Sequence, residues 1–157
     1  MIARAAFFLA CLLAAAPAFA NHYAVSEVPR MIPARDARKL IDAGIRVTDD
    51  LLRQAATADA RKQLAKKTGL RGARIDQLVR YADFLRLQNI GPEWVMLLDV
   101  AGVKSVPDLA GRSAPELTRK IEAANRTRHL ADPAPRQELV LDWISQAAKL
   151  PAVISPG

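Results

Sequence analysis

The sequence repeats itself at a distance of 58 residues. When residues 32–65 are laid on residues 90–123, ten of the 34 positions are identical, whereas the alanine-rich composition would give roughly three or four by chance. The identical pairs include Leu40 with Leu98, Gly44 with Gly102, Asp50 with Asp108, and Arg61 with Arg119. A repeat of this length indicates two copies of one supersecondary unit that bury a common core.

Each copy has the pattern of several short helices. Apolar residues recur every three or four positions, and these runs are bounded by residues that start or stop helices. The pattern predicts helices over 33–43, 48–52, 58–67 and 71–87, then over 92–101, a short helix near 105–108, and helices over 114–126 and 136–150. No segment alternates between apolar and polar residues for long enough to form a strand. We therefore expect an all-α fold of two helical units packed as one compact domain.

Individual residues mark the ends of these helices. Gly44, Gly69 and Gly102 follow helical runs and can adopt the left-handed backbone of a helix stop. Thr48, Thr57, Ser105 and Ser113 precede helical runs and are predicted N-caps, with Asp108 and Glu116 as partners three residues later. The two tryptophans, Trp94 and Trp143, lie on apolar helical stripes, and both are predicted to be core residues.

The first twenty residues predict export. Arg4 is followed by an apolar run and then by Ala18-Phe19-Ala20, which is the pattern of a secretory signal peptide cleaved after Ala20. The apolar run is too short for a membrane span. Cys11 is the only cysteine in the chain, so the mature protein would have no thiol. A lipid anchor at Cys11 is the alternative, and otherwise we expect a periplasmic or secreted protein.

These signals divide the chain into five parts. Residues 1–20 are the predicted signal peptide, and residues 21–29 lead into the first repeat. The first unit is predicted to span 30–89 and the second unit 90–150. Residues 151–157 form a predicted flexible tail because they are short, apolar and follow the last helical pattern.

The junction at Asn89-Ile90-Gly91 has the features of a hairpin between two helices. It resembles the helix–hairpin–helix motif, whose turn usually reads glycine, hydrophobic residue, glycine. The order of signals over 28–150, including Ala43-Gly44-Ile45, Asn89–Glu93 and Asp142-Trp143-Ile144, is similar to a tandem helix–hairpin–helix family catalogued as a domain of unknown function. The resemblance implies a tandem helix–hairpin–helix fold, and it implies no activity.

A helix–hairpin–helix turn can hold a nucleic-acid backbone because its backbone N–H groups and the following helix N-terminus suit a phosphate. The chain carries a formal net charge of +7, and an acid-free basic stretch runs through the first unit. The predicted polyanion-binding residues are Asn89, Ile90, Gly91, Arg61, Lys62, Lys66, Lys67, Arg71 and Arg74. Basic residues in the second unit, from Arg119 to His129, echo this stretch.

Three features argue against a phosphate site. Glu93 places an anion beside the second hairpin, and Met31-Ile32-Pro33 occupies the first hairpin, where Pro33 lacks an N–H donor. The basic stretch can also be a solvated helix face. A scaffold that has lost its phosphate site is therefore an alternative, and an exposed apolar patch around Val28, Met31 and Ile32 would support it.

The sequence shows no set of residues with catalytic or metal-ligand spacing. His22 and His129 lie far apart, and no nucleotide-binding glycine loop or nucleophile motif occurs. We therefore expect no enzyme activity, no metal and no cofactor. The sequence predicts an exported, non-enzymatic binding module for a nucleic-acid backbone or another acidic polymer. The alternative is a protein-interaction or scaffold module with a protein partner in the cell envelope.

Overall fold

The structure is a computed structural model that describes residues 22–155, so the predicted signal peptide and Pro156-Gly157 lie outside the described residues. The described chain folds into helices and contains no strand beyond an isolated bridge between Ala24 and Val47. The helices are α1 (Ala34–Asp42), α2 (Thr48–Ala55), α3 (Ala58–Thr68), α4 (Gly72–Phe84), α5 (Pro92–Val100), α6 (Val106–Ala110), α7 (Ala114–Arg128) and α8 (Gln137–Ala147). The predicted all-α fold is confirmed.

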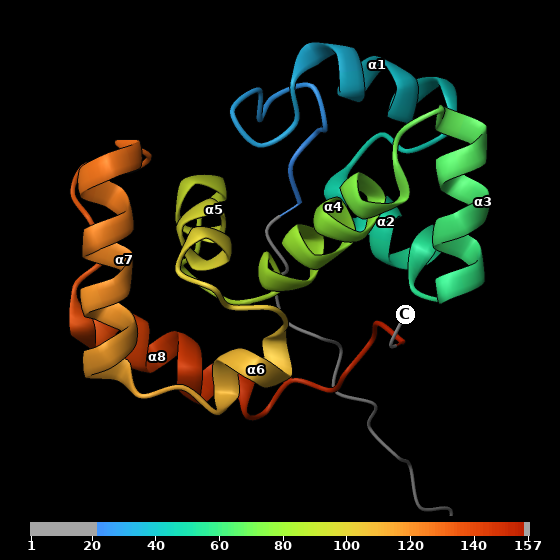
Figure 1. Cartoon of the computed structure of the whole chain (residues 1–157). Helices are drawn as coiled ribbons and strands as arrows, with labels where there is room; N and C mark the ends of the chain where they lie inside the picture. The colour runs from blue at the N-terminus through green and yellow to red at the C-terminus, as the bar shows by residue number, and fades with distance from the viewer. Residues whose placement is uncertain (1–21, 156–157) are drawn as a thin grey trace, which may run out of the picture.

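The helices form two groups that meet at α4 and α5 (Figure 1). In the first group α2 and α3 pack on α4 and on each other, and α1 packs on α3. In the second group α8 packs on α6 and α7, and α5 packs on α7. The bounds of α5 and the start of α6 follow those of α1 and α2 at the 58-residue distance of the sequence repeat.

The repeated residues also make equivalent contacts in the turns that end α1 and α5. Gly44 and Gly102 both have φ of +88°, a conformation that suits glycine. Asp50 accepts a hydrogen bond from the Arg46 N–H at 2.8 Å, as Asp108 does from the Lys104 N–H at 2.7 Å. The side chains of Gln54 and Arg112, which are also 58 residues apart, donate to the carbonyls of Gly44 and Gly102 at 3.3 and 3.0 Å.

The predicted caps are partly correct. The side chains of Thr57 and Ser105 accept hydrogen bonds from N–H groups at the starts of α3 and α6. The prediction for Thr48 is wrong: Val47 is the N-cap of α2, and the Thr48 hydroxyl instead accepts a bond from the Tyr23 N–H at 3.2 Å. Ser113 occupies the N-cap position of α7 but makes no side-chain capping bond.

Apolar side chains from both groups form one continuous core. Trp143 on α8 is fully buried, as predicted. Trp94 on α5 is only partly buried and packs against the Trp143 ring, with the ring centroids 5.3 Å apart and the planes tilted by 49°. The two tryptophan rings thus bring α5 and α8 into contact within the second group.

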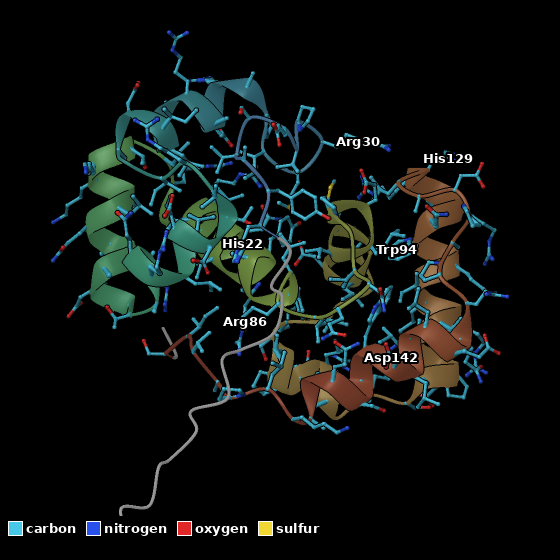
Figure 2. The ribbon with its side chains drawn as sticks, turned by 180° about the vertical axis from the view of Figure 1, so that it is seen from behind. His22, Arg30, Arg86, Trp94, His129 and Asp142 are labelled. Atoms are coloured by element: carbon cyan, nitrogen blue, oxygen red, sulfur yellow. The ribbon has the colours of Figure 1, made fainter. Side chains whose placement is uncertain are left out.

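Hydrogen bonds connect the segment before α1 and the segment after α8 to distant parts of the fold. Arg30 donates to the carbonyls of His129 and Leu130 at 2.9 and 3.0 Å, and Figure 2 shows it extending from the first group toward the end of α7. Residues 151–155, where the sequence predicts a flexible tail, lie along the first group. The Ser155 N–H donates to the Ala56 carbonyl at 3.0 Å, and Arg86 donates to the Pro151 carbonyl at 3.0 Å.

A partly buried polar network joins α1, α4 and α5. Arg74 on α4 donates to Asp36 on α1 at 3.0 Å and to Gln77 at 2.6 Å. Gln77 in turn donates to Asp99 on α5 at 2.9 Å. The Tyr81 hydroxyl and the Arg80 guanidinium donate to the same carboxylate at 2.8 and 3.0 Å. Asp99 is therefore the acceptor that fixes α5 against α4.

These donors control the ionisation of Asp99. Burial by itself would raise the pKa of Asp99, but the hydrogen bonds from Gln77, Tyr81 and Arg80 together outweigh burial and lower it. Burial and the neighbouring Asp99 carboxylate also raise the pKa of the Tyr81 hydroxyl, so Tyr81 remains a donor at neutral pH. The network is thus complete only when Asp99 is ionised.

We predict that Asp99→Asn lowers the free energy of unfolding at pH 7 by about 2 kcal/mol, because a charged acceptor of three donors is removed. Since the pKa of folded Asp99 lies below the unfolded value of about 3.9, its stabilisation is present above that pH and is lost as the pH falls through the folded-state pKa. Urea unfolding from neutral to acidic pH measures both effects.

Asp142→Asn is the matched control, because Asp142 is exposed on α8 and accepts a bond only from Gln146 in the described structure. It should change stability by less than about 0.5 kcal/mol. Equal losses of stability in the two variants would show that the network does not stabilise the fold.

Candidate polyanion-binding surfaces

The turn between α4 and α5 has a defined backbone conformation. Asn89 is exposed and has φ of +57°, in the left-handed region that asparagine tolerates better than most residues. The Ile90 side chain is 2% exposed and belongs to the core. Gly91 is the N-cap of α5, and Pro92 occupies its first turn. Of the three predicted hairpin residues, Asn89 and Gly91 therefore reach the surface, while Ile90 anchors the turn from beneath.

Glu93 lies over this turn. Its Oε2 atom is 3.5 Å from the position that a Cβ atom would take on Gly91. A carboxylate at a helix N-terminus interacts favourably with the helix dipole and with first-turn N–H groups. The same interaction competes with a phosphate for this position. The second hairpin thus carries its own anion, which weakens it as a phosphate site.

Arg61 and Arg74 are engaged inside the fold. Arg61 is 7% exposed and donates to Asp76 at 2.8 Å, to the Ala56 carbonyl at 2.8 Å and to the Ser155 carbonyl at 3.0 Å. Arg74 belongs to the polar network and also donates to the Met31 carbonyl at 2.8 Å. These two predicted site residues therefore hold helices and the C-terminal segment together, and their guanidinium groups are already paired within the fold.

The remaining predicted basic residues lie on the outside of the first group. Lys66 and Arg71 are exposed and make no ion pair with any residue of 22–155. Lys62 is exposed and has a 3.4 Å contact with Asp59, which is also exposed. A pair of this kind is screened by water and leaves Lys62 available.

Two lysines join the C-terminal ends of α1 and α3. Lys67 on α3 donates to the Ala43 carbonyl at 2.7 Å, and Lys39 on α1 donates to the Gly69 carbonyl at 3.3 Å. Both contacts place a cation at a helix C-terminus, where the helix dipole favours it. They also fix the two helix ends next to each other, at the upper right of Figure 1.

This junction gathers basic residues that are separate in the sequence. We name it the basic corner, and it consists of Arg38, Lys39, Lys66, Lys67 and Arg71. Its acidic neighbour along the chain is the exposed Asp42. Arg38 is included as the exposed neighbour of Lys39 along α1. Sequence reasoning missed Lys39, because only the packing of α1 on α3 brings it to the Gly69 carbonyl at the end of α3.

The other predicted surfaces do not join the basic corner. Figure 1 shows α3 at the outer edge of the first group, α5 in the middle and α7 on the far side. The hairpin turn and the basic residues from Arg119 to His129 thus form separate regions. The apolar patch that would support a scaffold role is not formed, since Val28, Met31 and Ile32 are buried.

Within residues 22–155 no three histidine, cysteine or acidic side chains are grouped so that they could hold a metal ion. No helix in this part of the chain is long and apolar enough to cross a membrane.

A family model matches residues 30–150 of the chain. The chain belongs to the family described as "Domain of unknown function (DUF4332)". This confirms the resemblance seen in the sequence, and the family description carries no activity. No curated protein and no solved structure matches the chain. Evidence for the role of this DUF4332 domain therefore has to come from its own surfaces.

We predict that Arg61→Gln lowers the free energy of unfolding by about 2 kcal/mol, because it removes charged hydrogen bonds from a buried side chain. The Asp76 side chain is 50% exposed, so water screens the Arg61–Asp76 pair and limits the loss of stability. Lys62→Gln, on the same helix but exposed, is the matched control and should cost less than about 0.5 kcal/mol. Duplex DNA affinity measured on folded protein should be unchanged in Arg61→Gln, and a loss of affinity in this variant would show that Arg61 contacts the ligand.

Proposed function

We propose that this is an exported, non-enzymatic module that binds a nucleic-acid backbone or a similar polyanion through the basic corner. One observation carries the proposal: Arg38, Lys66 and Arg71 are exposed without an ion-pair partner in residues 22–155. They are near in sequence to Lys39 and Lys67, whose contacts are with backbone carbonyls and join α1 to α3. Lys62 extends this surface along α3.

Such a surface would bind by charge. Each phosphate that a lysine or arginine contacts releases a condensed counterion, so the affinity falls steeply with salt. Contacts of this kind position a strand and do not read its sequence. The carbonyl ends of α1 and α3 would repel a phosphate, but Lys39 and Lys67 bind these carbonyls and neutralise both ends.

The hairpin then has a supporting role in the proposal. Asn89, with φ of +57°, allows the sharp turn, and Ile90 anchors it in the core. Because Glu93 stands beside Gly91, we assign the main contacts to the basic corner. The scaffold alternative draws support from this carboxylate, but its expected apolar patch at Val28, Met31 and Ile32 is buried.

The test is a titration of the mature protein with a fluorescent DNA duplex at several salt concentrations. We predict that Lys66→Glu combined with Arg71→Glu weakens binding at low salt. The slope of the logarithm of the affinity against the logarithm of salt should become less negative by about one for each phosphate that the variant no longer neutralises. Lys67 is left unchanged, because its hydrogen bond to Ala43 is also structural.

Arg119→Glu combined with Lys120→Glu is the matched control, since both residues are exposed on α7 and the net charge changes equally. This control should keep most of the affinity. No binding of the unmodified protein at low salt would refute the proposal. Equal weakening in the two double variants would reduce it to unspecific attraction by net charge.

A further inference from the structure

A cavity of about 580 Å³ lies between the first group, α6 and the C-terminal segment. Its volume is in the range of small-molecule sites. The side chains that line it from α3 and α4 are charged, and the remaining walls come from the second group and from residues 152–155. The charged residues are Arg61, Asp76, Arg80 and Asp83, and the second group contributes Lys104, Ser105 and Pro107. The cavity belongs to a different part of the molecule from the basic corner and has no role in the proposed polyanion binding.

The charges in its wall are compensated except for one. Arg61 pairs with Asp76 at 2.8 Å, and Arg80 pairs with Asp99 at 3.0 Å. Asp83 pairs with Arg86 at 2.5 Å. Lys104 is exposed and forms no ion pair within residues 22–155, and the Asp108 carboxylate that it attracts at longer range is already paired with Arg112. The wall therefore has an excess of one positive charge at Lys104.

Two polar groups among the lining residues can each donate one more hydrogen bond. The Ser105 hydroxyl oxygen accepts a bond from the Asp108 N–H at 3.1 Å, which leaves its own hydrogen available to an acceptor. The Nε atom of Arg80 is buried and has no acceptor in the described structure. Both groups, like the Lys104 ammonium, are hydrogen-bond donors, and a carboxylate would be a suitable acceptor.

The other lining residues that matter for a ligand are apolar. Val153 and Ile154 line the cavity from the C-terminal segment, and Pro107 lines it from α6. Ile154 is partly buried and packs against the core, while Val153 is 39% exposed, one of the more exposed large apolar side chains. An apolar ligand body in the cavity would cover such surface.

We propose that this cavity binds a small amphipathic monocarboxylate, with its carboxylate at Lys104 and Ser105 and its apolar chain against Pro107, Val153 and Ile154. The C-terminal segment forms one wall of the site. Its position is fixed by the bonds of Arg61 to the Ser155 carbonyl and of Arg86 to the Pro151 carbonyl, both at 3.0 Å. The C-terminal residues thus act as part of a binding site.

Octanoate is the probe, and isothermal titration of the mature protein measures its affinity. Octanoate should bind more tightly than octanol of the same chain length, because only the carboxylate can pair with Lys104. Lys104→Glu should weaken octanoate binding at least about tenfold, as expected when an attractive charge becomes repulsive. The same variant should gain affinity for octylammonium.

Lys149→Glu is the matched control, since Lys149 is exposed and does not line the cavity. It should leave octanoate affinity unchanged. Circular dichroism checks that each variant is folded. No octanoate binding, equal binding of octanol, or equal weakening in the two variants would overturn the proposal. Duplex DNA binding should be the same for Lys104→Glu and Lys149→Glu, so the outcome is independent of the polyanion proposal.

Discussion

The arrangement of the two helical groups depends on the carboxylate of Asp99. It accepts bonds from Gln77, Tyr81 and Arg80, all on α4, and Gln77 is linked through Arg74 to Asp36 on α1. Buried polar groups are costly unless every partner is in place, so they allow far fewer arrangements than apolar contacts do. Burial of the apolar core holds α4 and α5 together, and Asp99 determines how they are aligned.

The basic side chains of the first group are of two kinds, those paired within the fold and those exposed on its surface. Arg61 is buried and Arg74 is partly buried, and carboxylates and backbone carbonyls accept hydrogen bonds from both. Lys66 and Arg71 lie a few residues away in the sequence, on the outside. Arginine suits the interior role because its planar donors can bind several acceptors at once. A formal net charge therefore overstates what a basic chain offers to a ligand.

Sequence periodicity and stop residues were sufficient for the helices, because these features depend on neighbours along the chain. The turns at Gly44, Gly69 and Gly102 formed as expected, with positive φ at each. The predictions that failed involved long-range contacts. Thr48 is bonded to Tyr23 instead of capping α2. The burial of Val28, Met31 and Ile32, on which support for the scaffold alternative depends, is likewise decided by long-range contacts. No local pattern reports on such contacts.

By itself, the sequence determined the all-α class and the membership of the DUF4332 family. Only the tertiary structure decided which basic residues are free, because burial and pairing depend on what packs against each side chain. It buried Arg61, placed Glu93 beside Gly91 and brought Lys39 to the end of α3. A helix can be predicted from its own residues, whereas a binding surface is formed by several helices at once.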